Sequence, residues 1–340
     1  MDIPDEFINS ILTDHQICAY KNPSTKIVAE ATKTSTKVTL DNIKKGPYKD
    51  FVDVFLEEGF QEFPPHRHWD HAIDLTPNWE TKHWKPRIYP LSPQEKAKMN
   101  KQLDELIASG RIKPSKSPLA SPTFFVGKKD GKLQMVIDYR KLNDITIKNS
   151  YPIPLIPEIV HKWKGCKQFT KLDVCAGYHN IQIKPGDEWK TAFTTHCRLF
   201  QWRVMPFGVC NAPTTFQNMM NNIFIVHIRR GDTDPYINNV LIGTASDPKG
   251  RLDNDKFHKS IVCQVLQEFR NNKLYLKAEK CFFSQKSVEY LGTVVDGQGS
   301  RMDPEKIKAI IEWPTPSTLT QLCSFLGFLN FYQGFINDFS

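Results

Sequence analysis

Residues 236–242 constrain the fold of this chain more than any other segment, because they predict a tight antiparallel hairpin. They read Tyr-Ile-Asn-Asn-Val-Leu-Ile, so apolar and β-branched residues stand on both sides of the polar pair Asn238-Asn239. A polar dipeptide between two such runs is typical of the tip of a β-hairpin. We therefore expect two paired strands here, with the asparagines at their tip.

The remaining periodicity predicts helices and short strands in mixed order. Apolar residues at helical spacing and helix-start signals predict helices over 95–109, 211–224 and 257–269, and after Asp303 and Thr318. Gly110 is a candidate C-cap of the first of these helices. Alternating or apolar runs predict strands at 123–126, 133–137, 169–174 and 181–183, with a turn at 129–131 between the first two. This order indicates an α+β architecture.

The composition allows a sizeable core and argues against a membrane-embedded protein. Of the 340 residues, 40% are apolar and 11% aromatic, and no apolar run approaches the roughly 18–20 residues of a membrane span. The first six residues are acidic and mixed, so no signal peptide is evident. The eight cysteines show no C-x-x-C pair and no framework spacing. We therefore expect an intracellular protein, cytoplasmic or nuclear, with reduced thiols.

Positive charge is concentrated in one stretch of the chain. The formal net charge is +8, and residues 111–149 hold nine Lys/Arg against three Asp, a local net of +6. A charge cluster is usually a solvated face. Here the basic residues are interleaved with Phe124, Phe125 and Tyr139, and this combination suits contact with a phosphate backbone.

An ordered set of motifs resembles the reverse transcriptase of gypsy-type long-terminal-repeat retrotransposons, which forms part of a Pol polyprotein. The matching segments lie at 117–122, 128–133, 137–143, 169–174, 177–179, 205–208, 211–213, 216–217, 276–281, 290–292, 301–304 and 324–328. The hairpin at 236–239 stands where that family carries Tyr-x-Asp-Asp. Each motif alone is a weak signal, but the ordered set, which covers residues 50–340, is specific.

The resemblance implies a right-hand polymerase fold of the α+β class, with fingers, a palm of antiparallel sheet plus helices, and a partial thumb. We expect a partly ordered linker over 1–48, an N-terminal extension and fingers over 49–165, a palm with a second fingers segment over 166–297, and a thumb over 298–340. The family continues beyond this point into connection and RNase H domains. The implied partners are an RNA or DNA template–primer and a deoxynucleoside triphosphate, whereas the oligomeric state is left open.

The resemblance also implies a catalytic centre with two Mg²⁺ ions. Such ions, roughly 3.5–4 Å apart, lower the pKa of the primer 3′-hydroxyl and hold the triphosphate. Asp173, at the end of a predicted strand, would ligate both ions, and positions 238 and 239 would supply the other ligands. Alone, Asp173 could equally be a strand-end cap. Lys280 matches a proposed proton donor for the leaving pyrophosphate, although a lone lysine is more often a solvated surface residue.

Further positions match the family's nucleotide and primer contacts. The nucleotide-binding positions are Lys128, Gln134, Val174, Tyr178, Phe207 and Gly208. Of these, Lys128 would contact the γ-phosphate, and Tyr178 would exclude a 2′-hydroxyl by its bulk, unless it is a core tyrosine. Phe207 and Gly208 would form a loop against the template and the nucleotide base. Tyr290, Leu291 and Gly292 would form the primer grip.

The asparagine pair departs from the family where charge matters most. An amide oxygen carries no charge, so the expected metal cluster loses two negative charges. At an effective dielectric of 20, one unit-charge pair ~4 Å apart contributes ~4 kcal/mol, which is about three orders of magnitude in rate. Asp234 lies four residues before Asn238, or ~13 Å along a strand, and is too far to substitute. Asp232 is farther still.

A second departure lies in the fingers, where the family has arginine and this chain has Gln134. Glutamine cannot reproduce the bidentate, charge-assisted clamp that arginine makes on a phosphate. Asp→Asn and Arg→Gln can each arise from a single G-to-A change. Arg→Cys can arise from a single C-to-T change, which would likewise account for Cys175, Cys197 and Cys323. We therefore hypothesise a transposon copy that is decaying by cytosine deamination.

His66, His68 and His71 form a second candidate metal site, which we reject. Pro64, Pro65 and Trp69 make the segment a loop and no fourth ligand stands out, so a structural role fits better.

Three functions remain open from the sequence. The chain is an RNA-directed DNA polymerase domain with little or no activity, a non-catalytic primer–template-binding protein, or an inert remnant of a transposon.

Overall fold

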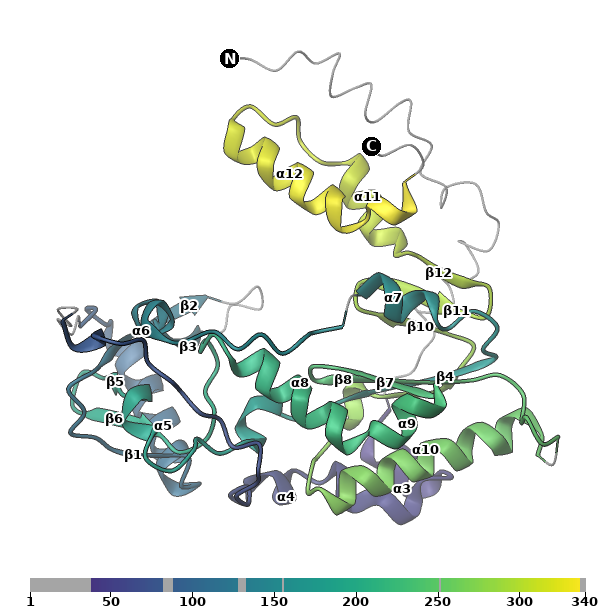
Figure 1. Cartoon of the computed structure of the whole chain (residues 1–340), viewed down its shortest axis with the longest axis horizontal. Helices are drawn as coiled ribbons and strands as arrows, with labels where there is room; N and C mark the ends of the chain where they lie inside the picture. The colour runs from purple at the N-terminus through teal and green to yellow at the C-terminus, as the bar shows by residue number, and fades with distance from the viewer. Residues whose placement is uncertain (1–37, 82–87, 128–132, 155, 251, 337–340) are drawn as a thin grey trace.

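The computed structural model describes residues 38–336 apart from 82–87, 128–132, 155 and 251 (Figure 1). Its α-helices are α3 (Leu40–Lys45), α4 (Glu57–Gln61), α5 (Pro93–Ala108), α6 (Arg140–Ile145), α7 (Ile156–His161), α8 (Ala212–Ile223), α9 (Ile225–Arg230), α10 (Asn254–Asn271), α11 (Pro304–Ile311) and α12 (Leu319–Phe331). Short 3-10 helices lie at Lys49–Phe55, Trp79–Thr81, Gly177–Asn180, Glu188–Thr191, Ala278–Lys280 and Gln333–Phe335. None of the described helices is both long and apolar enough to cross a membrane.

The palm is a four-stranded antiparallel sheet in the order β7-β8-β4-β9. Its strands are β7 (Thr233–Tyr236), β8 (Asn239–Thr244), β4 (Gln168–Asp173) and β9 (Phe282–Gln285). The expected hairpin is confirmed as β7 and β8, but its two-residue turn is Ile237-Asn238 and not the asparagine pair, because Asn239 already pairs with Tyr236 as the first residue of β8. Because β8 also pairs with β4, the hairpin tip lies beside the end of β4.

Helices α8 and α10 pack against the palm sheet, as their apolar stripes predicted. Phe216, Met219 and Met220 of α8 and Val262 and Val265 of α10 are fully buried. The Asp253 side chain caps α10 by accepting a hydrogen bond from the Lys256 amide. Alternation on the strands puts Leu172, Val240 and Ile242 into this main core.

The fingers are built around a five-stranded sheet in the order β1-β6-β5-β2-β3. Its strands are β1 (Ile112–Pro114), β2 (Ser121–Gly127), β3 (Leu133–Ile137), β5 (Phe193–Thr194) and β6 (Leu199–Trp202). The predicted strands at 123–126 and 133–137 are confirmed, whereas the turn predicted at 129–131 lies outside the described residues. Residues 181–183 form isolated bridges with His71 and Val204 instead of the expected strand.

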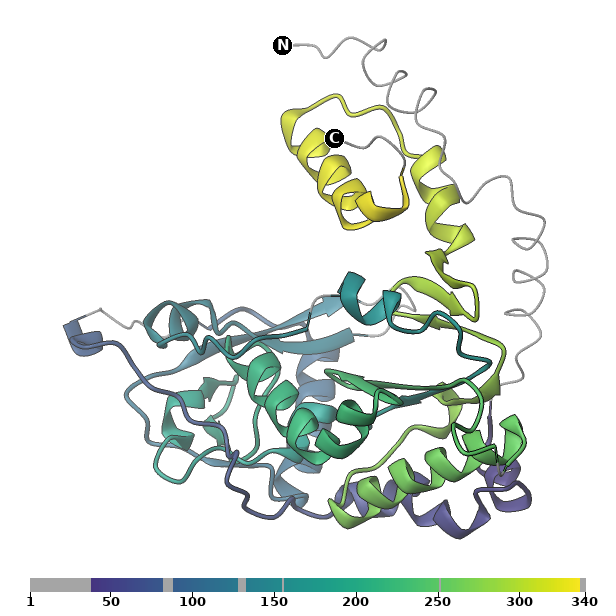
Figure 2. The same ribbon diagram turned by 45° about the vertical axis from the view of Figure 1, so that its right-hand side comes forward.

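A smaller sheet lies on the side of the palm away from the fingers, and two helices stand above the palm (Figures 1 and 2). The strands β10 (Ser287–Tyr290), β11 (Thr293–Asp296) and β12 (Gly299–Met302) form an antiparallel sheet. Helices α11 and α12 follow it, and both start at the predicted residues, because Asp303 and Thr318 cap them. These two helices share their own apolar cluster, which includes Ile307, Phe325 and Leu329.

Two segments near the predicted domain boundaries pack against distant parts of the chain. Helix α3, inside the expected linker, buries Ile43, and the following 3-10 helix packs against α10 of the palm. Helix α7, in the expected fingers range, lies by β12 in Figure 1, and Trp163 just after it joins the palm cluster around Phe169. The chain therefore crosses from fingers to palm before α7, because Trp163 finds its apolar partners there.

A buried histidine in the palm predicts a pH-dependent stability. His258 is fully buried, and its ring nitrogens share hydrogen bonds with the hydroxyls of Thr170 (2.7 Å) and Thr244 (2.9 Å). Burial lowers the pKa of His258 to about 4 from 6.5. As the pH falls, the histidine therefore becomes protonated in the unfolded chain before it does in the folded chain. The fold has its full stability above about pH 6.5 and loses up to about 3 kcal/mol of it as the pH falls toward 4.

Urea unfolding of the native chain and of His258→Gln between pH 7 and 4 measures this effect. We expect a flatter pH dependence for the variant. Equal slopes for the two chains would show that folding does not lower the pKa of His258.

Candidate functional site

Asp173 and the asparagine pair meet at one end of the palm sheet. Asp173 is the last residue of β4 and stands directly opposite Asn239 of β8, which in an antiparallel pair separates the Cα atoms by about 4.5–5.5 Å. The Val174 amide donates to the Asn238 carbonyl at 2.8 Å, and the Asn239 side-chain amide donates to the Asn238 side-chain oxygen at 3.2 Å. The residues that the motifs assigned to one site are therefore adjacent.

The hairpin tip has a strained backbone that a buried glutamine holds in place. Ile237 has φ = +49°, a conformation that is a genuine outlier for a β-branched residue. Gln217 of α8, fully buried, accepts a hydrogen bond from the Ile237 amide and donates one to the Pro235 carbonyl, both at 2.8 Å. Gln217 thus fixes the position of the asparagines relative to β4, and the motif at 216–217 gave no sign of this role.

Replacing Gln217 with methionine is expected to destabilise the fold by about 2–3 kcal/mol. The Ile237 amide and the Pro235 carbonyl would lose their buried partners, and each such loss costs about 1–3 kcal/mol. Urea unfolding gives the stability, and amide hydrogen exchange at Ile237 reports local loosening of the tip. Asn222→Ala, on the exposed side of the same helix, should stay within about 0.5 kcal/mol. A methionine variant as stable as that control would show that these hydrogen bonds do not hold the hairpin.

Lysines surround the single remaining carboxylate of the site. Burial raises the pKa of Asp173, and Lys280, Lys277 and Lys171 act in the opposite direction. The Lys280 ammonium lies 3.8 Å from the Asp173 carboxylate, and its side chain is 55% exposed. Lys280, which the motifs assigned to the same site, therefore meets Asp173 in a long ion pair.

The donor set at the tip does not fit a pair of Mg²⁺ ions, which prefer hard carboxylate oxygens. The other two positions assigned to the site, Asn238 and Asn239, offer Asp173 only neutral amides as neighbours. Asp234 pairs with Lys162 at 2.8 Å, and Asp232 pairs with Arg230 at 2.7 Å. Among the described residues, no group of three His, Cys, Asp or Glu side chains could hold a metal ion.

The other predicted nucleotide positions surround the same end of the palm. Tyr178 lies in the 3-10 helix at Gly177–Asn180, and its ring packs against Phe207 at 4.8 Å and Phe216 at 5.7 Å between centroids. Phe207 itself is 58% exposed. Val174 is buried and adjoins Asp173, and Gln134 is exposed on β3. Lys128 lies outside the described residues.

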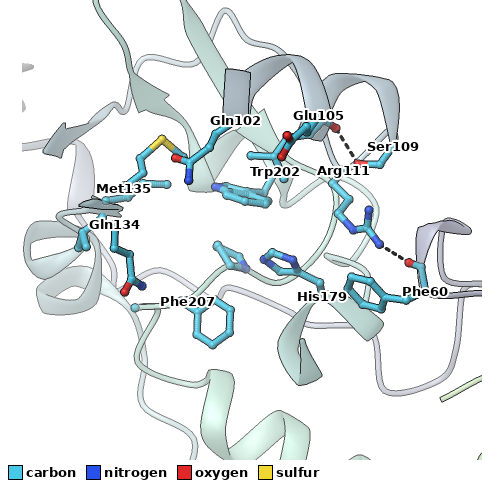
Figure 3. A pocket seen from close by; sticks show the side chains of 15 residues that line it. Phe60, Gln102, Glu105, Ser109, Arg111, Gln134, Met135, His179, Trp202 and Phe207 are labelled. Carbon is cyan, nitrogen blue, oxygen red and sulfur yellow. Dashed lines mark hydrogen bonds between the residues drawn. The ribbon is translucent and has the colours of Figure 1, made fainter. Parts of the chain in front are cut away.

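A cavity of about 480 Å³ opens beside these positions, between α5, β3 and β6 of the fingers and the segment at 206–208 (Figure 3). Gln134, Phe207 and Gly208 line it together with Arg111 and Trp202, which sequence reasoning did not assign to a site. Arg111 is buried, its guanidinium lies 4.6 Å from the centre of the Phe60 ring, and burial lowers its pKa. Arg111 directly precedes β1, and Trp202 lies on β6, which pairs with β1. This pairing joins distant parts of the chain, so no local pattern could reveal the two side chains.

The predicted primer grip is the turn between β10 and β11. Leu291 and Gly292 form this turn, with φ values of +52° and +81°. Tyr290 is fully buried, and its hydroxyl donates to the Asp234 carbonyl at 3.1 Å. The tyrosine therefore ties the turn to β7.

The three histidines of the rejected metal site have separate partners, and the His68 ring packs against that of Trp69 with 4.1 Å between centroids. The His66 ring contacts the Asp70 carboxylate at 2.6 Å. His71 is buried and shares a hydrogen bond of 2.9 Å with the Thr215 hydroxyl. These contacts fit the structural role that the sequence predicted.

Fingers around a five-stranded sheet, an antiparallel palm with a carboxylate beside a hairpin, and a following helical segment define the right-hand polymerase fold. The chain belongs to the reverse transcriptase family. A family model described as "Reverse transcriptase (RNA-dependent DNA polymerase)" matches residues 126–295, which is half of the chain.

The relatives agree with this family. The chain is 34% identical over 303 residues to the Tf2-7 and Tf2-3 transposon polyproteins of Schizosaccharomyces pombe, a match that covers 87% of the chain and 22% of each polyprotein. Tf2 is a gypsy-type element, so the resemblance found in the motifs is confirmed. The chain spans about a fifth of the length of these relatives.

Solved structures confirm the predicted fold. A foamy viral protease–reverse transcriptase in complex with RNA/DNA hybrid matches 97% of the chain and 40% of its own length, with a TM-score of 0.68 and 19% identity. A complex of the same kind of enzyme with double-stranded DNA matches 90% of the chain and 52% of its own length, with a TM-score of 0.70 and 21% identity.

Proposed function

We propose that this chain is a reverse transcriptase domain that binds primer–template nucleic acid but has lost most or all of its nucleotidyl transfer. The observation that carries the proposal is the pairing of Asp173 with Asn239 across β4 and β8. The scaffold of a polymerase site is retained, while two of its three expected carboxylates are neutral amides.

Loss of catalysis follows from the charge of the site. Reverse transcriptases use divalent metal ions, and a single carboxylate with two amides holds them poorly. Gln134 on β3 would add a second defect, because it cannot clamp the triphosphate of an incoming deoxynucleotide as arginine does. The two defects lie on different elements and act on different parts of the reaction.

Retained binding has separate support. The foamy viral enzymes of similar fold were solved with RNA/DNA hybrid and with double-stranded DNA. In this chain the fingers stretch at 111–149 carries a net charge of +6, and phosphate contacts by lysine and arginine dominate the affinity of such proteins. These features do not depend on the asparagine pair.

Fluorescence anisotropy with an RNA-template/DNA-primer hybrid tests the binding. We expect log Kd to rise linearly with log salt concentration, and Lys116→Gln/Lys148→Gln to weaken binding and lower the slope by about 1 per lysine. Lys44→Gln/Lys45→Gln on α3, which lies beneath α10 in Figure 1, is the matched control and should bind like the native chain.

Failure of the native chain to bind the hybrid at low salt would overturn the proposal. The chain would then be an inert remnant of a transposon. Robust primer extension by the native chain would overturn the other half of the proposal, the loss of catalysis.

A further inference from the structure

We infer that the cavity between α5, β3 and β6 is a binding site for a small planar aromatic carboxylate, which the Arg111 guanidinium would hold. The cavity is separate from the site at the hairpin, because Asp173, Asn238 and Asn239 do not line it. Its volume of about 480 Å³ lies within the range of small-molecule sites, about 300–1,000 Å³. Binding there requires neither metal ions nor nucleic acid.

Arg111 is a buried cation without a counter-ion among the described residues. It is 6% exposed, and it takes part in none of the ion pairs in the described part of the chain. Its guanidinium donates to the Phe60 carbonyl and lies 4.6 Å from the centre of the Phe60 ring, so both of these contacts are to neutral groups. Its Nε has no hydrogen-bond partner among the described residues. Because a buried charge is normally paired, this arginine favours an anionic ligand.

Two further polar atoms of residues that line the cavity are buried without a hydrogen-bond partner in the described part of the chain. They are the side-chain oxygen of Gln102 on α5 and the indole Nε1 of Trp202 on β6. The first is an acceptor and the second a donor. Buried polar atoms in proteins nearly always have partners. An unpaired acceptor and an unpaired donor beside an unpaired cation therefore favour a ligand with complementary polar groups.

The walls of the cavity favour a ligand with a planar ring. The His179 ring lies between those of Trp202 and Phe207, with 5.2 Å and 5.6 Å between centroids, and Met135 lines the same space (Figure 3). Aromatic rings and a thioether pack well against an aromatic ligand. Burial and the nearby Arg111 lower the pKa of His179 to about 4, so this ring is neutral at pH 7 and adds no positive charge.

The charges at the cavity favour a carboxylate over a phosphate. Among the described residues that line it, Arg111 is the one cationic side chain at pH 7, and Glu105 of α5 is the one anionic side chain. A single guanidinium balances a monoanion, whereas a phosphate group carries about 1.5–2 negative charges near pH 7. Glu105 is exposed, and its charge adds to the repulsion that a second negative charge would meet. We therefore assign the site to a monoanion.

Isothermal titration calorimetry at pH 7 with indole-2-carboxylate and its neutral amide tests the site. The two probes share one ring system and differ in charge. We expect the native chain to bind the acid at least about tenfold more tightly than the amide, because hydrogen bonds between ionised partners are the stronger ones. Arg111→Gln should remove this preference. Arg203→Gln, the matched control, should keep it, because the Arg203 guanidinium lies 4.3 Å from the centre of the Phe63 ring but does not line the cavity.

A second variant, Met135→Trp, locates the bound probe. The larger side chain fills part of the cavity and should weaken binding of both probes by about tenfold or more. Circular dichroism shows which variants are folded, and the comparison of acid with amide on the native chain needs no variant. Equal affinity of the native chain for the two probes, or no binding of the acid at millimolar concentration, would overturn the inference. So would an acid preference that survives in folded Arg111→Gln, or binding that Met135→Trp leaves unchanged.

Discussion

Restoring aspartates at positions 238 and 239 should raise the rate of primer extension by at least about three orders of magnitude. Each restored charge lies near the metal ions that the family uses, where a unit-charge pair ~4 Å apart contributes ~4 kcal/mol at an effective dielectric of 20. One such interaction made in the transition state corresponds to about a thousandfold in rate. The backbone already places both positions beside Asp173, so the substitution changes charge with little change in shape.

Single-turnover extension of an RNA-templated DNA primer in saturating Mg²⁺ measures this gain. The matched control adds Asp173→Asn to the double variant, and this chain should return to the native rate because its metal ligands are again incomplete. Adding Gln134→Arg to the double variant should lower the KM for the deoxynucleotide below that of the double variant. A double variant that extends no faster than the native chain would show that the hairpin is not what limits catalysis.

The second large effect is expected in the core beneath the primer grip. Trp163 is fully buried among Phe169, Leu241 and Tyr290. Trp163→Ala should therefore destabilise the fold by about 3–5 kcal/mol. Gly243 on β8 lies against this ring: an added Cβ would stand 2.5 Å from Trp163 Cε3, so Gly243→Ala should cost about 1–3 kcal/mol.

A double-mutant cycle separates this contact from a general weakness of the strand. In the Trp163→Ala background the methyl group of Gly243→Ala enters the space left by the ring, so its cost should fall to near zero. Urea unfolding of the four chains gives the coupling energy. Additive effects of the two substitutions would mean that Trp163 does not press on Gly243.

Local patterns predicted the parts of this fold that are local in origin. The stripe of Phe216, Met219 and Met220 predicted α8, and the caps Asp303 and Thr318 predicted the two thumb helices, since periodicity and capping act within a few residues. The hairpin and its nearness to Asp173 followed from the ordered motifs. The expected strand at 181–183 failed because two short bridges, made to His71 and Val204, hold that segment instead.

Long-range packing accounts for what the sequence did not predict. Gln217 reads as one more polar residue on a helix until β7 and β8 fold against it. Arg111 and Trp202, 91 positions apart in the chain, meet at one cavity because β1, which follows Arg111, pairs with β6, which carries Trp202. The position of Lys277 and Lys280 near Asp173 likewise depends on the bridge between Val174 and Leu276.

Binding of Mn²⁺, followed by electron paramagnetic resonance, tests most directly whether the asparagine pair has removed the metal site. The chains to compare are the native protein and Asn238→Asp/Asn239→Asp, each with a dideoxy-terminated primer–template and a deoxynucleotide. The same double variant with Asp173→Asn corrects for ions held by the nucleic acid and the nucleotide. We predict about two additional ions for the double variant and none for the native chain. Two additional ions on the native chain, with the affinity of the double variant, would contradict this account of the site.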